Sequence, residues 1–110
     1  MEKFDLGPHM ETWKENLQEE QNEREQTLQK SKEMLEVYNA KLYCIRDVMG
    51  VTSEDDTEQL TELIKMQDEL KKHIMDLSKD IDELEKEINI HSRLNLQLFV
   101  TIDKNSKQTI

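Results

Sequence analysis

The chain has little of what compact domains and catalytic sites are built from. Its 110 residues include two glycines, one proline and one cysteine, and aromatic side chains make up 5% of the total. So few glycines leave no phosphate-binding loop, and the sequence has no run of about 18 apolar residues that could span a bilayer. Because the single Cys44 cannot form a disulfide within the chain, we expect an intracellular protein of the cytoplasm or nucleus.

Charge is what the chain has in abundance. Charged residues make up 36% of it and hydrophobic residues 35%, a balance typical of long helices and coiled coils. The formal net charge is −10, so nucleic acid and anionic membranes are poor direct ligands, and a protein partner with a basic face is the better match. Disorder is the alternative for so charged a chain, but apolar periodicity between about residues 28 and 93 argues against it.

Apolar residues recur every seven positions in the second half of the chain. From Leu63 to Ile88, isoleucine occupies position a and leucine position d of a heptad, which makes a narrow seam suited to burial against another helix. A similar heptad runs through an earlier helix, so the sequence predicts helices at about 11–49 and 54–93. The predicted oligomer interface consists of Leu35, Tyr38, Leu42, Ile45, Met49, Leu60, Leu63, Leu70, Ile74, Leu77, Ile81, Leu84 and Ile88.

A break is predicted between the two helices, at residues 50–53. Gly50 follows an apolar run, as glycine often does where a helix stops, and Thr52 or Ser53 could cap the next helix. The heptad phase also shifts by four residues here, which a break explains. The predicted fold is therefore all-α, an elongated coiled coil of two helices interrupted near Gly50.

The apolar face is wider beside the break than elsewhere. Residues 34–49 offer apolar side chains over more than half of the helix circumference, and Ile64 and Met66 widen the second helix. Such a face is typical of a bundle of three or four helices. We therefore expect the two segments to pack locally around the break, with Cys44 buried as an inert thiol and residues 76–93 forming a two-stranded coil.

The wide faces could meet within one chain, as a hairpin, or between chains. A full-length hairpin is less favoured, because it would set Gln21 and Arg24 of the first seam against the best part of the second. That part includes Leu77, Ile81 and Leu84. Polar residues on the first seam bury little apolar area, so the start of the first helix should be weakly held.

Charges beside the seam bear on whether the helix pairs with a copy of itself. In a parallel homodimer, Asp80 would face Glu85 of the mate, and a like-charge pair costs a few tenths of a kcal/mol. No opposite-charge pair is evident to compensate for it. We therefore expect a hetero-oligomer rather than a homodimer.

The pattern changes at residues 94–103, which start with alternating apolar and polar residues and are rich in β-formers. This predicts a short strand, with extension of the helix as the alternative. A coiled coil that passes directly into Leu94-Asn-Leu-Gln-Leu-Phe-Val-Thr-Ile-Asp103 resembles the rod-to-head transition of kinetochore subunits with small RWD-type heads. The resemblance covers roughly the last third of the chain. It implies a missing head beyond the strand, with residues 104–110 as a tail here, and a heteromeric scaffold that links centromere and microtubule machinery in dividing cells.

No constellation for catalysis or metal binding is apparent. His9, His73 and His91 are not spaced to share a metal ion, and Cys44 has no histidine nearby in the sequence. General acid–base catalysis needs a concave, partly dry site, which an elongated helix lacks. We expect no enzyme activity, no metal, no cofactor and no small-molecule substrate.

The expected function is protein–protein interaction, as a coiled-coil scaffold segment of a larger complex, kinetochore or cytoskeletal. The alternative is an adaptor that recruits a folded partner, such as a motor or trafficking factor, through the widened surface or through Trp13. Trp13 and Leu17 form the candidate partner anchor, because Trp13 stands in a polar stretch and aromatic residues often carry binding energy. Packing of Trp13 near Leu17 at a fraying helix end is the alternative for this pair.

Residues 1–10 look foreign to the rest of the chain. Gly7-Pro8-His9-Met10 resembles the remnant of a protease site joined to a cloning-site methionine. We therefore expect residues 1–10 to originate from expression and the natural segment to begin near Glu11.

Overall fold

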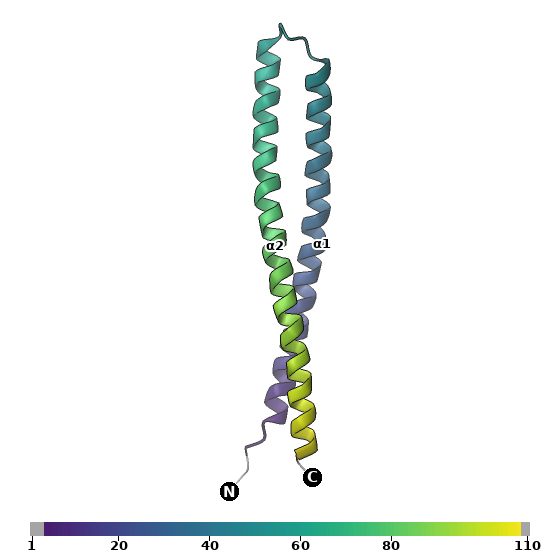
Figure 1. Ribbon diagram of the computed structural model, residues 1–110, viewed down its shortest axis with the longest axis vertical. Helices are drawn as coiled ribbons and strands as arrows, with labels where there is room; N and C mark the ends of the chain where they lie inside the picture. The colour runs from purple at the N-terminus through teal and green to yellow at the C-terminus, as the bar shows by residue number, and fades with distance from the viewer. Residues whose placement is uncertain (1–3, 109–110) are drawn as a thin grey trace. The chain divides into compact units, whose positions relative to one another are not determined.

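The computed structural model describes residues 4–108, and the side chains of residues 4–104. In this part of the chain it contains two α-helices and no strand. Helix α1 spans Gly7–Val51 and helix α2 spans Thr57–Gln108 (Figure 1). The prediction of an all-α chain with two helices interrupted near Gly50 is confirmed for the described residues. Helix α1 extends beyond its predicted bounds at both ends, whereas α2 begins three residues later than predicted and continues past residue 93.

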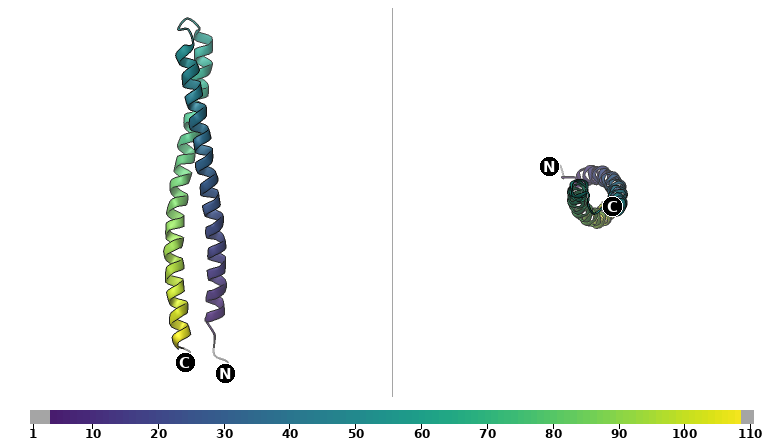
Figure 2. Two further views of the ribbon diagram at one scale, coloured as in Figure 1. Left: turned by 90° about the vertical axis from the view of Figure 1, so that its right-hand side faces the viewer. Right: turned by 90° about the horizontal axis from the view of Figure 1, so that it is seen from above.

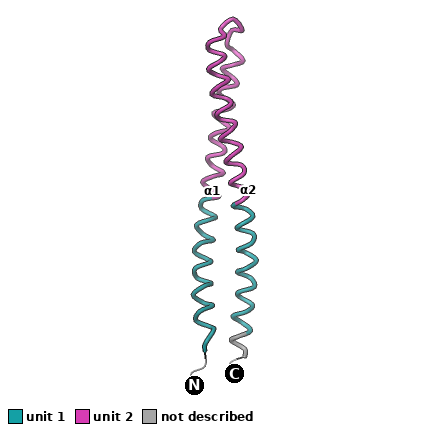
Figure 3. The backbone as a smooth tube through the Cα atoms, turned by 90° about the vertical axis from the view of Figure 1, so that its left-hand side faces the viewer, with its two compact units in different colours: residues 1–27, 84–110 teal, residues 28–83 magenta. Residues whose placement is uncertain are grey.

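The chain divides into two compact units, each built from a segment of α1 and a segment of α2 (Figure 3). Unit 1 comprises Met1–Thr27 and Leu84–Ile110, and unit 2 comprises Leu28–Glu83. In each unit the two helical segments lie side by side and run antiparallel (Figure 2). A connection as short as residues 52–56 requires this direction, because helices joined by a few residues must fold back on each other.

The heptad positions explain why the helices pair. Every residue of the predicted oligomer interface is buried or half-buried, whereas most of the residues between them are exposed. In unit 2 the most buried apolar side chains are Leu42 and Ile81, and in unit 1 they are Leu17 and Leu98. Burial of a narrow apolar seam thus holds each pair of segments together, and the seam that was expected to join chains joins two helices of one chain.

This pairing corrects the expected arrangement. A full-length hairpin was the less favoured choice, and residues 76–93 were expected to form a two-stranded coil. In unit 1, Gln21 lies against Ile88 and Ser92, and Arg24 lies near Glu87. The two polar residues therefore face a more polar part of α2 than Leu77 and its neighbours. The most apolar part of the second seam thus does not have to pack against them.

The connection between the helices is ordered by local hydrogen bonds. Thr52 Oγ1 donates to the carbonyl of Val48 at 2.6 Å, and the amide of Asp56 donates to the carbonyl of Ser53 at 3.0 Å, which closes a turn. The amide of Gln59 donates to Asp56 Oδ1 at 3.1 Å. Asp56 is therefore the N-cap of α2, and the prediction of a cap at Thr52 or Ser53 was wrong by a few residues.

Gly50 does not end α1 in the way that was expected. The helix continues to Val51, and Gly50 does not have a positive φ. It therefore lacks the left-handed conformation that makes glycine a helix stop. The helix ends where the Thr52 amide turns back to the carbonyl of Met49 at 3.3 Å.

The cap gives a direct test of this connection. Asp56→Ala should lower the free energy of unfolding by about 1 kcal/mol, because the amide of Gln59 loses its acceptor and the carboxylate leaves the positive end of α2. Urea unfolding followed by circular dichroism measures the change. Asp55→Ala removes the same charge from an exposed neighbour and should change the value by less than about 0.5 kcal/mol. Equal losses in the two variants would show that Asp56 is not the cap.

Residues 94–103 are helical throughout, so the strand prediction was wrong. Leu98 is 2% exposed and Leu94 is half-buried, whereas Leu96 between them is 71% exposed. That is helical spacing, with residues four apart on the buried face. The β-forming residues were a weak guide, because packing against α1 overrides intrinsic propensity. The transition that carried the resemblance to kinetochore subunits is therefore absent from the described residues.

Candidate protein-interaction surface

Unit 2 carries a row of mostly apolar side chains that α2 does not cover. These residues follow the three-four spacing of a heptad, as the seam does; the first five each stand just before a seam residue, and the last continues the spacing to the end of α1. We call them the second stripe, and they are Met34, Val37, Lys41, Cys44, Val48 and Val51.

The second stripe is exposed because one partner helix covers only one side of α1. Successive residues of an α-helix are about 100° apart around its axis, so the second stripe points away from the seam by that angle. Val37 is 45% exposed, Val48 is 49% exposed and Val51 is 87% exposed. A second stripe of this kind is found on helices that contact two neighbours, as in a bundle.

Cys44 shows the difference between expectation and structure most directly. It was expected to be a buried thiol, because it lies in the wide apolar face of residues 34–49. It is exposed, since it belongs to the second stripe and α2 covers only the seam. A bundle of three or four helices in unit 2 would therefore need at least one further helix from outside this unit.

The second stripe forms one wall of an open groove in unit 2. The groove has a volume of about 640 Å³, within the range of natural binding sites. Helix α2 supplies the other wall with Met66, which is 50% exposed, and with Glu69. At the far end of this wall His73 stacks on Tyr38, with ring centroids 5.9 Å apart. The full lining is Val37, Ala40, Lys41, Cys44, Ile45, Met66, Glu69, Leu70 and His73.

A second hollow of unit 2 lies nearer the helix connection and is more acidic. It is lined by Val48, one helical turn after Cys44, and by Glu62, one turn before Met66. Asp56 and Glu58 also line it. The sequence offered a signal that was missed: Glu62 and Glu69 recur at the same heptad position, beside the apolar wall.

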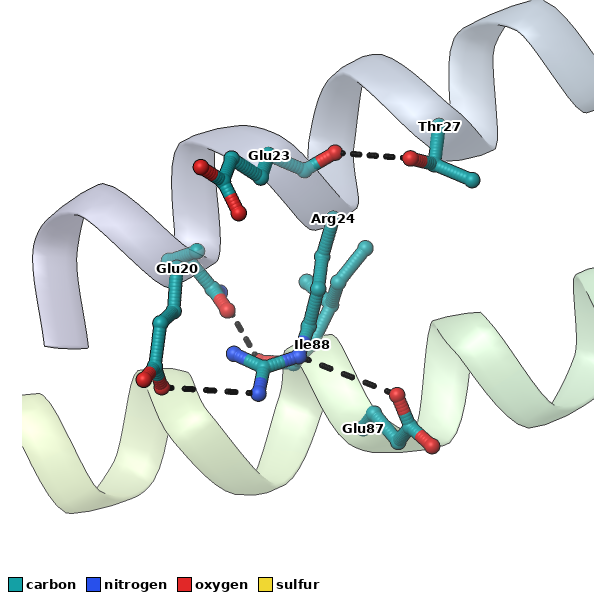
Figure 4. A network of polar contacts seen from close by, with 7 residues as sticks. Glu20, Glu23, Arg24, Thr27, Glu87 and Ile88 are labelled. Carbon is teal, nitrogen blue, oxygen red and sulfur yellow. Dashed lines mark hydrogen bonds and ion pairs between the residues drawn. The ribbon is translucent and has the colours of Figure 1, made fainter.

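Unit 1 is held together partly by polar contacts. Gln21 is 7% exposed, and its Nε2 donates to the carbonyl of Ile88 and to Ser92 Oγ, both at 3.0 Å. The guanidinium of Arg24 lies between two carboxylates, 3.7 Å from Glu20 and 3.7 Å from Glu87 (Figure 4). These contacts replace part of the apolar seam, in line with the expectation that this part of α1 buries little apolar area.

The polar cluster is not fully satisfied. The Gln21 Oε1, Arg24 Nη1, His91 Nδ1 and Asn95 Oδ1 atoms are buried without a hydrogen-bond partner in the structure. A buried polar atom without a partner destabilises the fold by about 1–3 kcal/mol. A cluster with such atoms is expected to add less stability than an apolar seam of the same size, while its hydrogen bonds favour one alignment of the two segments of unit 1.

The two residues of the candidate partner anchor, Trp13 and Leu17, differ in how exposed they are. Leu17 is 4% exposed and belongs to the seam of unit 1, whereas Trp13 is 43% exposed. Leu17 therefore has little surface to offer a partner. Nearby in the same unit, Lys14 Nζ lies 5.5 Å from the ring centroid of Phe99, which is 60% exposed. A partner role for Trp13 stays a prediction.

In the described part of the chain, no three His, Cys, Asp or Glu side chains lie close enough together to hold a metal ion. Neither helix, over its described residues, combines the length and apolar character needed to cross a membrane. The oligomer interface predicted from the heptads forms the contact between α1 and α2, and its use between chains stays a prediction.

Comparison of the chain with protein-family models, curated proteins and solved structures finds no match. The class of this protein is therefore described from its fold and its surface alone. It is an all-α chain of two antiparallel helices, with an apolar groove along one side of unit 2. Exposed apolar surface of this extent is typical of proteins that bind other proteins.

Proposed function

We propose that this chain is an assembly segment, a helical hairpin whose uncovered apolar stripe packs against a helix of another protein. The observation that carries the proposal is the second stripe. About half of the surface of Met34, Val37 and Val48 is left uncovered by the pairing of α1 with α2, and valine forms helices less readily than the glutamate and lysine that dominate the rest of the surface. A partner helix that covers the stripe explains their presence.

The contrast with the rest of α1 supports this proposal. The equivalent positions in unit 1 include Asn16, Glu20, Glu23 and Thr27, which are polar and exposed, and Trp13, which is 43% exposed. A row of mostly apolar side chains at these positions is thus found in unit 2, whereas in unit 1 the tryptophan is followed by polar residues. The strand on which the resemblance to kinetochore subunits rested is helical, so membership of a kinetochore is not part of the proposal.

Val37→Glu should weaken binding to a natural partner by at least about tenfold, since it places a charge in the apolar contact. The partner is obtained by cross-linking in cells and identified by mass spectrometry. Its affinity is then measured by calorimetry with both purified proteins. Val37 is exposed, so the substitution should leave the fold intact, which circular dichroism checks.

Asn39→Glu provides the matched control. It adds the same charge to an exposed position of α1, only two residues away but outside the second stripe. The control should bind as the unaltered chain does. A partner that binds both variants equally well would show that the stripe is not the interaction surface, and the proposal would fail.

A further inference from the structure

We infer that the groove of unit 2 binds one amphipathic helix of a different protein, and that this helix carries lysine or arginine along the side of its apolar stripe that faces α2. The inference rests on the proposed function and goes further by naming the chemistry of the partner. It follows from the shape of the groove and the charges along its edges, and from the length of the second stripe.

The shape of the groove suits a helix. In a bundle, a third helix packs into the groove between two neighbouring helices, and apolar residues at three-four spacing, as on the α1 wall, provide its contact. Val37 and Cys44 on α1 face Met66 on α2 across the groove, and the half-buried Ile45 and Leu70 form its floor. Ala40 also lines the groove, and its small side chain lets another backbone approach closely.

The length of the second stripe sets the length of the partner segment. The stripe runs from Met34 to Val51, close to five turns of α1, or about 26 Å at 1.5 Å per residue. A partner helix of about 18 residues covers it completely. That helix presents apolar residues at every third and fourth position, because this spacing matches the second stripe on α1.

The edges of the groove favour a basic partner. Glu62 and Glu69 stand one heptad apart along the α2 wall, and both are exposed. Asp56 and Glu58 add two carboxylates in the second hollow, nearer the connection, whereas Lys41 is the one lysine or arginine among the residues that line the groove and this hollow. Lysine or arginine beside the apolar stripe of the partner can pair with these carboxylates and speed association.

The same charges disfavour a second copy of this chain as the occupant. A copy carries the same groove and the same carboxylates, and each chain has a formal net charge of −10. Packing two such grooves together would bring Glu62 and Glu69 of both copies near one another without a matching excess of lysine. Like charges held close destabilise a contact, so the copy competes poorly with a basic helix.

Two designed peptides of about 18 residues test the inference with the full chain. Both have leucine and isoleucine at three-four spacing, and they differ in the flanking residues, which are lysine in the basic peptide and glutamate in the acidic peptide. Calorimetry should show one basic peptide bound per chain, at least about tenfold tighter than the acidic peptide, with the affinity falling as salt is raised.

Two variants of the chain test where the basic peptide binds. Val37→Glu should weaken its binding about tenfold or more relative to the matched Asn39→Glu control. The double substitution Glu62→Lys and Glu69→Lys should reverse the preference between the peptides.

The outcomes separate this inference from the proposed function. If both peptides bind equally well and Val37→Glu weakens both, the groove binds helices but charge does not select them, and only the inference is overturned. If the chain self-associates through Val37 in sedimentation and thereby excludes the basic peptide, the occupant is a second copy and the inference is again overturned. If Val37→Glu and Asn39→Glu bind the basic peptide alike, the peptide binds by charge alone, and the groove is not its site.

Discussion

Leu98→Ala should lower the free energy of unfolding by about 3 kcal/mol, the largest loss we expect from truncating one side chain. Leu98 is 2% exposed, the lowest exposed fraction among the core side chains of the described residues. Removing its buried methyl groups loses their transfer free energy and leaves a cavity between the helices of unit 1. Urea unfolding monitored by circular dichroism measures the loss.

Leu96→Ala is the matched control, because the two leucines lie two residues apart in α2. Leu96 is 71% exposed, so its truncation should change the free energy of unfolding by less than about 0.5 kcal/mol. The pair also separates the two conformations considered for this segment. In a strand, residues two apart share a face and both substitutions would have similar effects, so similar effects would contradict the helix.

Gln21→Leu should raise the free energy of unfolding by about 2 kcal/mol. The substitution removes two hydrogen bonds, but it also removes the buried Oε1 atom that has no partner. Ser92 is exposed and can turn its hydroxyl to water, so no new unpaired group is created. The apolar side chain then gains about 1.5–3 kcal/mol from burial at a seam position.

The control for this prediction is Gln18→Leu, an exposed glutamine on the same helix. It should change the free energy of unfolding by less than about 0.5 kcal/mol. A loss of stability in Gln21→Leu would mean that the hydrogen bonds across unit 1 outweigh the unpaired oxygen, and that the polar cluster stabilises the fold. A gain would agree with a cluster that fixes alignment at the expense of stability.

The pairing surfaces could be predicted from the sequence because they repeat. Seven-residue spacing places residues such as Leu42 and Ile81 on one side of a helix whatever the partner is. All predicted interface residues are accordingly buried or half-buried. The partner itself could not be predicted, because a heptad seam fits an antiparallel helix of the same chain and a helix of another chain equally well.

The strand prediction for residues 94–103 was wrong because their pattern fits both a strand and a helix. In the run from Leu94 to Leu98, the leucines alternate with polar residues, but the first and last are also four residues apart. Both a strand with period two and a helix with period 3.6 place Leu94 and Leu98 on one face. They differ only at Leu96, whose exposure depends on the packed structure and not on local sequence.

The candidate site was predicted in part. The wide face of residues 34–49 was recognised from its composition, and its extent indicated more than one neighbouring helix. The exposure of Cys44 could not be predicted, since burial depends on how many helices pack there. A pattern in one chain shows which surfaces can be buried, but it does not show whether this chain buries them by itself.

The exposed valines of the second stripe have a consequence for how long the chain survives before it assembles. Valine in a helix is less favourable than alanine by several tenths of a kcal/mol, so Val37, Val48 and Val51 destabilise the free chain slightly. A partner at a hundred times its dissociation constant adds about 2.7 kcal/mol to the stability of the chain. If the proposed partner binds, unassembled copies should thus unfold more often than assembled ones and be removed first by cellular proteases.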